Sequence, residues 1–289
     1  MKKTVCLTFD IEDWFQVENL RKVFPPETWD KQELRVEKNT HKILDILEEH
    51  NIKATFFVLG WIAERVPKLV KEISKRGHEI ASHGYGHLLN YNLSREQLKQ
   101  DLLKSKKVLE DITGKTVIGY RAPSFSISDE LMKLLAELGF RYDSSFNDFA
   151  KHDRYGKLSG AEGSKPFMHE TEVYEFPLPV VKKFGQNIPI SGGGYFRIMP
   201  LAIFKKLVMQ YLNNNKLYIF YMHPWEIDVT QPRIKKIKKV YYIRHYFGLS
   251  TTFNKLKNFI QMDPNNTQFI TLNGLISTGG NENAYCALK

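Results

Sequence analysis

Short apolar runs and amphipathic segments alternate along the first part of the chain. Residues 5–11 form a β-branched and aromatic run that ends abruptly in acidic residues, which is typical of a buried strand. An amphipathic segment around Ile43, Leu44 and Leu47 follows, and residues 54–59 are again continuously apolar. This order of strand, helix and strand predicts parallel β-α-β units and hence an α/β fold.

The same alternation continues to the end of the chain. Helices are predicted over residues 67–76, 94–113 and 128–138, and strands over residues 78–82, 140–144, 173–178, 218–222 and 269–272, with a further strand directly before Arg121. Ser94 and Gln97 have the spacing of a capping box, which marks the start of a helix. Residues 146–169 are polar and follow neither period, so we expect an insertion of loops or small hairpins.

The composition is that of one folded domain. A chain of 289 residues with 42% hydrophobic residues can bury a large core, so we predict a single domain over residues 1–276 and a flexible tail over residues 277–289. No apolar run reaches the roughly 18 residues of a membrane span, and a strand begins by Val5, so we expect a cytoplasmic protein, at most at the inner face of the membrane. The two cysteines do not form a disulfide framework, and Cys6 is interpreted as a small core residue.

The formal net charge of +10 raises the question of an acidic partner. The densest basic stretch covers residues 233–239, and it is equally interpreted as a solvated helix or loop face. No nucleic-acid-binding module or stacking platform accompanies it, so nucleic acid is not an expected partner. The charge instead favours an acidic glycan, a sugar nucleotide, or a membrane surface that carries a lipid-linked glycan. The oligomeric state does not follow from the sequence.

Acidic residues and histidines carry the candidate chemistry. Asp10, Glu12 and Asp13 lie at the end of the first predicted strand, and His83 and His87 are four residues apart in SHGYGH. A carboxylate and two imidazoles are ligands of catalytic divalent metals, and a further acid can act as a base. The histidine spacing suits one side of a helical turn, although the glycines between them favour a loop, and either geometry lets both reach one ion.

Five short motifs follow one another in an order that resembles one enzyme family. They are TFDIED, SHGYGH, Arg121-Ala122-Pro123, Tyr142-Asp143-Ser144-Ser145 and Tyr221-Met222-His223-Pro224. Together they resemble the polysaccharide deacetylases with the NodB homology domain, also called carbohydrate esterase family 4, over about residues 4 to 272, with the fourth motif diverged. FDIEDW, GGGYFR, HPWEID and RHYFGLSTTFNKL resemble the branch found in bacterial exopolysaccharide and surface-glycan gene sets.

The resemblance implies a distorted (β/α) barrel, often with seven strands, which periodicity alone does not separate from an open doubly wound sheet. It also implies catalytic roles for four residues. Asp10 is the expected general base, and Arg121 is expected to hold it ionised through a planar fork that lysine does not reproduce. His223 is the expected general acid, with Asp143 as the partner that orients it and raises its pKa.

The third metal ligand departs from the commonest family pattern, in which base and ligand are adjacent aspartates. Here Ile11 follows Asp10. Glu12 shares a strand face with Asp10, whereas a local turn would bring Asp13 inward, so both are candidate ligands beside the two histidines, and an exchange of roles between Asp10 and Asp13 stays open. The resemblance implies a divalent metal, with zinc expected and cobalt, nickel or manganese as alternatives.

Aromatic and polar residues near these motifs are candidates for sugar binding. They are Trp14, Tyr195, Arg197, Trp225 and Glu226. The glycines of GGGYFR let the backbone approach a sugar, or alternatively form a tight turn before a helix that starts near Pro200. The tryptophans supply stacking faces or belong to the core.

These observations predict a metal-dependent hydrolase that removes N-acetyl groups from an amino sugar of a bacterial surface glycan or its precursor, with O-deacetylation as a secondary activity. Two alternatives stay open. Relatives that open cyclic amides or remove formyl groups could apply the same residues to another carbon–nitrogen bond. A degraded enzyme scaffold could bind a glycan without catalysis.

Overall fold

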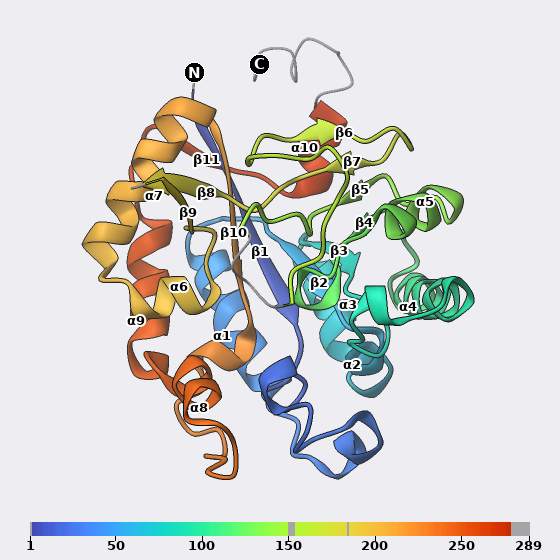
Figure 1. Cartoon of the computed structure of the whole chain (residues 1–289). Helices are drawn as coiled ribbons and strands as arrows, with labels where there is room; N and C mark the ends of the chain where they lie inside the picture. The colour runs from blue at the N-terminus through green and yellow to red at the C-terminus, as the bar shows by residue number, and fades with distance from the viewer. Residues whose placement is uncertain (1, 150–153, 184, 279–289) are drawn as a thin grey trace.

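A curled parallel β-sheet forms the centre of the computed structural model, which describes residues 2–149, 154–183 and 185–278 (Figure 1). In the described part of the chain, seven parallel strands follow one another across this sheet. In spatial order they are β10 (Leu217–Met222), β1 (Lys3–Ile11), β2 (Thr55–Val58), β3 (Glu79–Ser82), β4 (Gly119–Tyr120), β5 (Tyr142–Asp143) and β7 (Tyr174–Glu175). The α/β fold with a barrel-like parallel sheet is thereby confirmed.

Three further pairings complete the sheets. β6 (Phe167–Met168) runs antiparallel to β7, and β11 (Thr267–Phe269) pairs in parallel with the start of β1. β8 (Val180–Lys183) and β9 (Gln186–Pro189) form a separate antiparallel pair.

Helices surround the sheet (Figure 1). They are α1 (Val36–Glu49), α2 (Gly60–Arg65), α3 (Pro67–Lys75), α4 (Arg95–Thr113), α5 (Asp129–Glu137), α6 (Gly193–Ile198), α7 (Leu201–Asn215), α8 (Lys239–Tyr246), α9 (Leu249–Ile260) and α10 (Leu272–Thr278). Short 3₁₀ helices are η1 (Glu18–Leu20), η2 (Pro26–Lys31), η3 (Asn90–Asn92), η4 (Pro123–Phe125) and η5 (Pro224–Ile227). The predicted capping box at the start of α4 is confirmed, because Ser94 accepts from the Gln97 amide and the Gln97 side chain accepts from the Ser94 amide.

The first strand is buried in the core up to the point where the candidate acidic residues begin. From Val5 to Ile11 every residue of β1 is buried, and Cys6 is a fully buried core residue, as predicted. Residues at the carboxyl ends of neighbouring strands face one another: Asp10 lies opposite Phe57, and Tyr120 lies opposite Asp143. Parallel strands therefore deliver their terminal polar residues to one edge of the sheet.

The predicted insertion over residues 146–169 contains β6, which forms a small hairpin with β7 at the top of Figure 1. Residues 150–153 of the insertion lie outside the described residues, as does most of the predicted tail. The first two residues of that tail, 277 and 278, belong to α10. The predicted domain limit at residue 276 therefore falls inside a helix.

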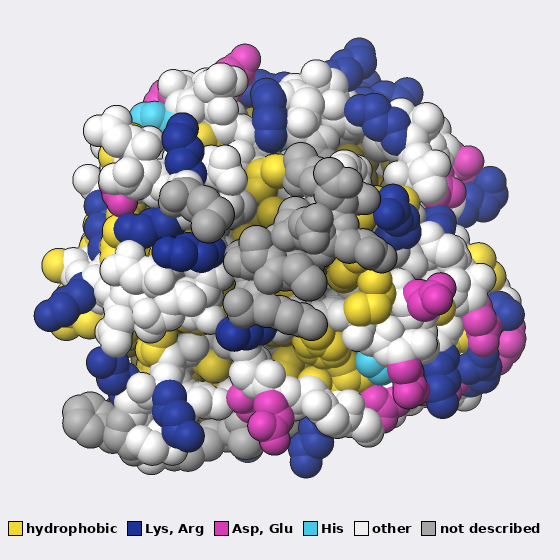
Figure 2. Space-filling view, turned by 90° about the horizontal axis from the view of Figure 1, so that it is seen from above, with side chains coloured by type: hydrophobic (Ala, Val, Ile, Leu, Met, Phe, Trp, Pro, Cys, Tyr) yellow, Lys and Arg dark blue, Asp and Glu magenta, His cyan; other side chains and the backbone are white. Residues whose placement is uncertain are grey.

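Positive charge is scattered over the upper face of the molecule (Figure 2). Figure 2, which views the molecule from the upper side of Figure 1, shows Lys and Arg side chains scattered over that face among hydrophobic and uncharged groups. Within the described ranges, no helix combines the length and the apolar character that crossing a bilayer would require.

Candidate metal-dependent active site

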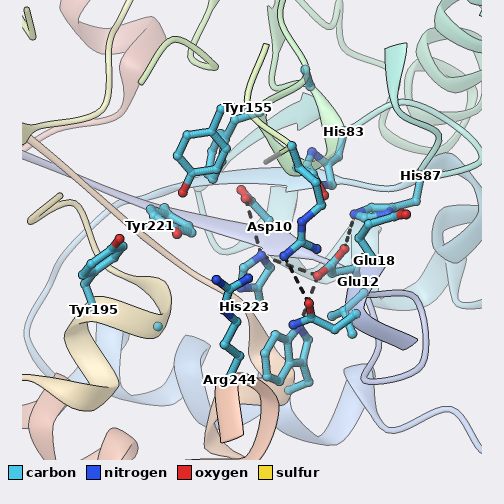
Figure 3. Close-up of a pocket in the computed structure, with 18 of the residues that line it drawn as sticks. Asp10, Glu12, Glu18, His83, His87, Tyr155, Tyr195, Tyr221, His223 and Arg244 are labelled. Carbon is cyan, nitrogen blue, oxygen red and sulfur yellow. Dashed lines mark hydrogen bonds and ion pairs between the residues drawn. The ribbon is translucent and has the colours of Figure 1, made fainter. Parts of the chain in front are cut away.

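Glu12, His83 and His87 form a buried cluster at the carboxyl edge of the sheet (Figure 3). Their ligand atoms lie within 4.8 Å of one another. Glu12 directly follows β1, and both histidines lie in the loop after β3. Oε2 of Glu12 is 2.5 Å from Nε2 of His87. The structure thus brings one of the two candidate carboxylates to the predicted histidine pair.

Hydrogen bonding and burial prepare the cluster for a cation. Nδ1 of His83 lies 2.8 Å from the carbonyl oxygen of Arg121, which accepts its proton and leaves Nε2 as a lone-pair donor. Burial lowers the pKa of His83 to about 4, so the imidazole is neutral. Burial opposes ionisation of Glu12, but His87 and His223 outweigh it and hold the pKa of this carboxyl below its usual range.

Among the described residues, the buried Oε2 of Glu12 has no polar partner besides its close contact with Nε2 of His87. A buried carboxylate beside two imidazoles is a donor set that fits a divalent metal ion.

The two histidines lie in a loop rather than on a helical turn. Gly84 has a φ of +72°, and His87 itself has a φ of +50°. Asp101 on α4 holds the loop, because its carboxylate accepts from the amides of Tyr85 at 2.7 Å and Gly86 at 3.0 Å. A Cβ at Gly84 would lie 2.9 Å from this carboxylate, so only glycine fits there.

Asp13 is not part of the cluster, and we correct its predicted role as a metal ligand. Its Oδ2 accepts from the amides of Arg35 at 2.6 Å and Val36 at 2.9 Å, and its Oδ1 accepts from the amide of Trp14 at 2.8 Å. These donors include the first amide of α1, so Asp13 caps that helix from a distance in sequence. Burial raises the pKa of Asp13 to about 6, against the effect of these hydrogen bonds.

Asp10 and Arg121 form the predicted buried ion pair. Nη1 of Arg121 donates to Oδ1 of Asp10 at 2.8 Å, and both side chains are almost completely buried. The same guanidinium donates to Oγ1 of Thr8 at 2.7 Å, and to the carbonyl and hydroxyl oxygens of Ser144 at 2.8 and 2.9 Å. These four bonds fix the orientation of Asp10, and a lysine ammonium could not form them in this geometry.

His223 lies beside the cluster through one ring nitrogen, and its other ring nitrogen contacts Glu226. Nε2 of His223 is 3.5 Å from Oε1 of Glu12 and 3.9 Å from Oδ2 of Asp10. Its Nδ1 is 2.7 Å from Oε1 of Glu226, whose other oxygen accepts from Nε of Arg197 at 2.6 Å. Burial alone would lower the pKa of His223, but Glu12 and Glu226 raise it to about 9. The imidazole therefore tends to carry a proton.

Asp143 is not the partner of His223, which corrects the prediction. Its Oδ1 accepts from the hydroxyl of Ser145 at 2.8 Å, and it lies beside Glu175 on the neighbouring strand. Burial raises the pKa of Asp143 to about 6, and burial together with the adjacent Asp143 charge raises that of Glu175 well above its usual range. The two carboxyls therefore share a proton, and Glu226 takes the position predicted for Asp143.

A cavity of about 300 Å³ opens over these groups. Tyr195 and Trp225, two of the residues predicted to bind substrate, line it. Trp225 also stacks between His223 and His245, with ring centroids at 5.3 and 4.5 Å, and its Nε1 donates to Oε1 of Glu12 at 3.2 Å. This tryptophan therefore positions the metal cluster as well as forming a wall.

The other three residues predicted to bind substrate contact protein groups in the structure. Trp14 is buried in the core, is absent from the cavity lining and donates to the carbonyl oxygen of Glu33. Arg197 reaches the lining, but its guanidinium is used by Glu226 and by the carbonyl oxygens of residues 244, 245 and 247. Glu226 is fully buried beneath His223.

Sequence reasoning missed several residues of the cavity. Arg154, Tyr155, Tyr221 and Arg244 also line it. The sequence does carry a signal for Glu226, because this residue follows His223 by three positions, which is the spacing of a capping box. In the structure, its carboxylate accepts from the His223 amide at 3.0 Å. For Arg154, Tyr155 and Arg244 we find no comparable pattern.

Two family models match the chain in succession. Residues 1–142, the first half, match the polysaccharide deacetylase model, and residues 144–277, the second half, match the domain of unknown function DUF3473. The peptidoglycan deacetylase of Helicobacter pylori is 32% identical over 149 residues, which are 47% of this chain and 51% of that protein. A peptidoglycan-N-acetylglucosamine deacetylase of Bacillus cereus is 37% identical over 102 residues, 35% of this chain and 47% of that protein.

The chain thus spans about half the length of these curated relatives. Among solved structures, that of a Mycobacterium smegmatis protein assigned to the polysaccharide deacetylases has a TM-score of 0.64 and 22% identity, and covers 96% of this chain and 90% of that one. This likeness extends over both halves and shows the shared fold. Residues 1–142, which carry the Glu12-His83-His87 cluster, belong to the polysaccharide deacetylase family, and residues 144–277 match the DUF3473 domain.

Proposed function

We propose that this chain is a metal-dependent N-deacetylase that acts on the acetamido group of an amino sugar in a bacterial surface glycan or its precursor. One observation carries the proposal: an acid paired with a buried arginine, a Glu-His-His cluster and a histidine bonded to a second carboxylate meet in one cavity. Amide hydrolysis needs a base for water, charge stabilisation at the acyl carbon and an acid for the leaving amine.

Glu12, His83 and His87 would hold the divalent cation, which would supply positive charge to polarise the acetyl carbonyl and to acidify water. Asp10 takes the proton of the attacking water. Its Oδ1 is bonded to Arg121, so Oδ2 is the oxygen left for this step, and it already faces Nε2 of His223. The bond to Arg121 fixes the orientation of this carboxylate in a buried site.

His223 protonates the departing amine. Its Nε2 lies 3.5 Å from Oε1 of Glu12 and 3.9 Å from Oδ2 of Asp10, while Glu226 accepts from Nδ1 and fixes the ring. Arg197 compensates the buried charge of Glu226, so the three side chains form a chain from the protein interior to the reacting atoms. This arrangement favours a protonated imidazole before the amine leaves.

We propose zinc as the metal, because two imidazoles and one carboxylate with an open position are a common set of ligands for catalytic zinc. Cobalt, nickel and manganese are alternatives that the metal content of the purified protein distinguishes. The names of the curated relatives point to peptidoglycan as one class of N-acetylated glycan. A cytoplasmic location, and contact with the membrane through the basic surface, stay predictions.

Release of acetate tests this function. The purified protein is incubated with N-acetylglucosamine oligosaccharides, peptidoglycan fragments and a UDP-linked N-acetyl sugar, before and after chelation and with zinc added back. We expect acetate from at least one substrate, loss of turnover on chelation and recovery with metal. The matched variant Asp10→Asn should keep the metal and lose turnover, because it retains the ligands but not the base.

Other outcomes separate the alternatives. A protein that binds metal and releases formate or a ring-opened product without acetate would favour another carbon–nitrogen bond. If the wild type released no product, and Asp10→Asn bound glycan as tightly, the chain would be a glycan-binding protein.

A further inference from the structure

Arg244 enters the cavity from the second half of the chain, on the side away from the metal cluster. It lies on α8 and lines the cavity together with Tyr155 and Tyr195. Figure 3 shows Tyr195 and Arg244 on one side of Asp10 and His223, with Glu12 and His87 on the other. The polysaccharide deacetylase chemistry described above does not use this side.

The acidic groups of the cavity have partners other than Arg244. Asp10 pairs with Arg121, and Glu18 lies 3.4 Å from Arg21. Glu12 faces the histidines. Within the described ranges, the side chain of Arg244 makes no hydrogen bond or ion pair, so the α8 side of the cavity keeps an uncompensated positive charge.

The backbone under Arg244 is held in place. Nη2 of Arg197 donates to the carbonyl oxygen of Arg244 at 2.7 Å, and Nε of the same guanidinium donates to Glu226, the carboxylate behind His223. A single buried arginine therefore sets the position of α8 relative to the general acid. Arg244 is itself exposed, so the charge of its side chain is available to a ligand while its backbone is held in place.

Phenol groups lie near the guanidinium. Burial raises the pKa of Tyr155 and of Tyr195, and the charge of Arg244 opposes the rise in both, which places it within electrostatic reach of the two hydroxyls. The Tyr195 hydroxyl makes no hydrogen bond within the described part of the chain, and its ring is only half-buried. A planar cation beside a phenolic donor is a recognition pattern for oxyanions.

We propose that Arg244, with Tyr195, binds an anionic substituent of the substrate, a phosphate or a carboxylate, while the acetamido group lies over Asp10 and His223. The inference rests on the proposed deacetylase function and names its substrate class: an acidic amino-sugar glycan or a phosphate-linked precursor. Phosphate and carboxylate offer the same oxyanion chemistry to a guanidinium, and substrates carrying each of them distinguish the two sources.

Substrate preference tests the proposal. Acetate release is compared for a neutral N-acetylglucosamine tetrasaccharide, a UDP-linked N-acetylglucosamine and an N-acetylated disaccharide that carries a uronic acid. Arg244→Gln should lower kcat/KM for an anionic substrate about ten- to a hundredfold more than for the neutral one, as expected for a charge-assisted hydrogen bond. Arg244→Lys should recover part of the preference for anionic over neutral substrates. In the wild type, added salt should reduce this preference, because ions screen the charge of the guanidinium.

Lys239→Gln on the same helix is the matched control, since it removes an exposed positive charge outside the cavity lining. It should not change the ratio between anionic and neutral substrates. An equal loss for all three substrates in Arg244→Gln, or an equal shift of the ratio in Lys239→Gln, would overturn the proposal.

If the wild type releases no acetate from any substrate, the deacetylase function fails, and the anion site is judged separately. Inorganic phosphate and glucuronate are then titrated calorimetrically into wild type and Arg244→Gln. Weaker binding of either anion by the variant supports the site, and equal or absent binding refutes it.

Discussion

The two halves of the chain build the cavity in different ways. The first half supplies Asp10, Glu12 and the two histidines, each at or just beyond the end of a parallel strand. The second half supplies His223 after β10, and then Tyr195 and Arg244 from helices outside the sheet. The first side is therefore set by strand order, whereas the second depends on hydrogen bonds between segments far apart in sequence.

Arg197 illustrates the second kind of construction. Its guanidinium joins Glu226 to the carbonyl oxygens of residues 244, 245 and 247. One side chain thus holds both Glu226, the partner of His223, and the helix that carries Arg244. Under the proposed function, the first half would supply the base and the metal ligands, and the second half would supply the general acid together with Arg244.

The largest expected effect contrasts two neighbouring acids of the first half. Glu12→Gln should remove bound metal and lower acetate release about a thousandfold, because the loss of a metal ligand removes several kcal/mol of charge stabilisation. Asp13→Asn should keep the metal and instead lower the free energy of unfolding by about 1 to 2 kcal/mol, through weaker capping of α1. Metal content, acetate release and urea unfolding measure the two outcomes.

Loss of metal from the Asp13→Asn variant, with metal retained by the Glu12→Gln variant, would reverse the assignment of these two acids. Asp13→Asn also controls for the loss of one negative charge at this edge of the sheet.

A second prediction concerns the partner of His223 in the second half. Glu226→Gln should lower kcat about ten- to a hundredfold with little change in KM, because it weakens the support of a general acid and leaves the Arg197 charge uncompensated. Asp143→Asn, the control, should change stability more than kcat, since Asp143 contacts Ser145 and Glu175 rather than His223. Steady-state kinetics with the best substrate and thermal unfolding separate these effects. A larger kcat loss in Asp143→Asn would restore the partner expected from the family motif.

The smallest expected effect is on the free energy of unfolding, and it concerns the contact between the two halves, where Glu175 on β7 lies next to Asp143 on β5. Burial and the Asp143 charge raise the pKa of Glu175 in the folded protein. A raised carboxyl pKa contributes stability below the unfolded pKa, and this contribution is lost as pH rises towards the folded pKa. The free energy of unfolding should therefore fall as pH increases from about 5 to about 8.

Glu175→Gln should flatten this dependence. Its amide carbonyl can accept from Ser145 and Phe146, as Oε1 of Glu175 does, and its NH₂ group can donate to Asp143. Urea unfolding across this pH range measures the slope for both proteins. An unchanged slope would show that the carboxyl pair does not control it.

Much of the fold could be predicted because its signals are local. Buried strand residues are apolar in short runs, and the capping box at Ser94 satisfies amides within one turn, so both are visible in a sequence window. The parallel strand ends also predicted that Asp10 and Arg121 would meet. The roles of Asp13, Asp143 and Trp14 could not be predicted, because an acid or a tryptophan near a motif fits several partners equally well.

The sequence by itself determined the parallel α/β architecture, the residue types of a metal site and the family, since these depend on local patterns and on short motifs. Tertiary structure alone decided which acid joins the histidines, that Glu226 supports His223, and that Arg244 reaches the cavity. These contacts depend on side-chain direction and on loops that pack across long distances in sequence, where a change of one position redirects a carboxylate from a metal cluster to a helix cap.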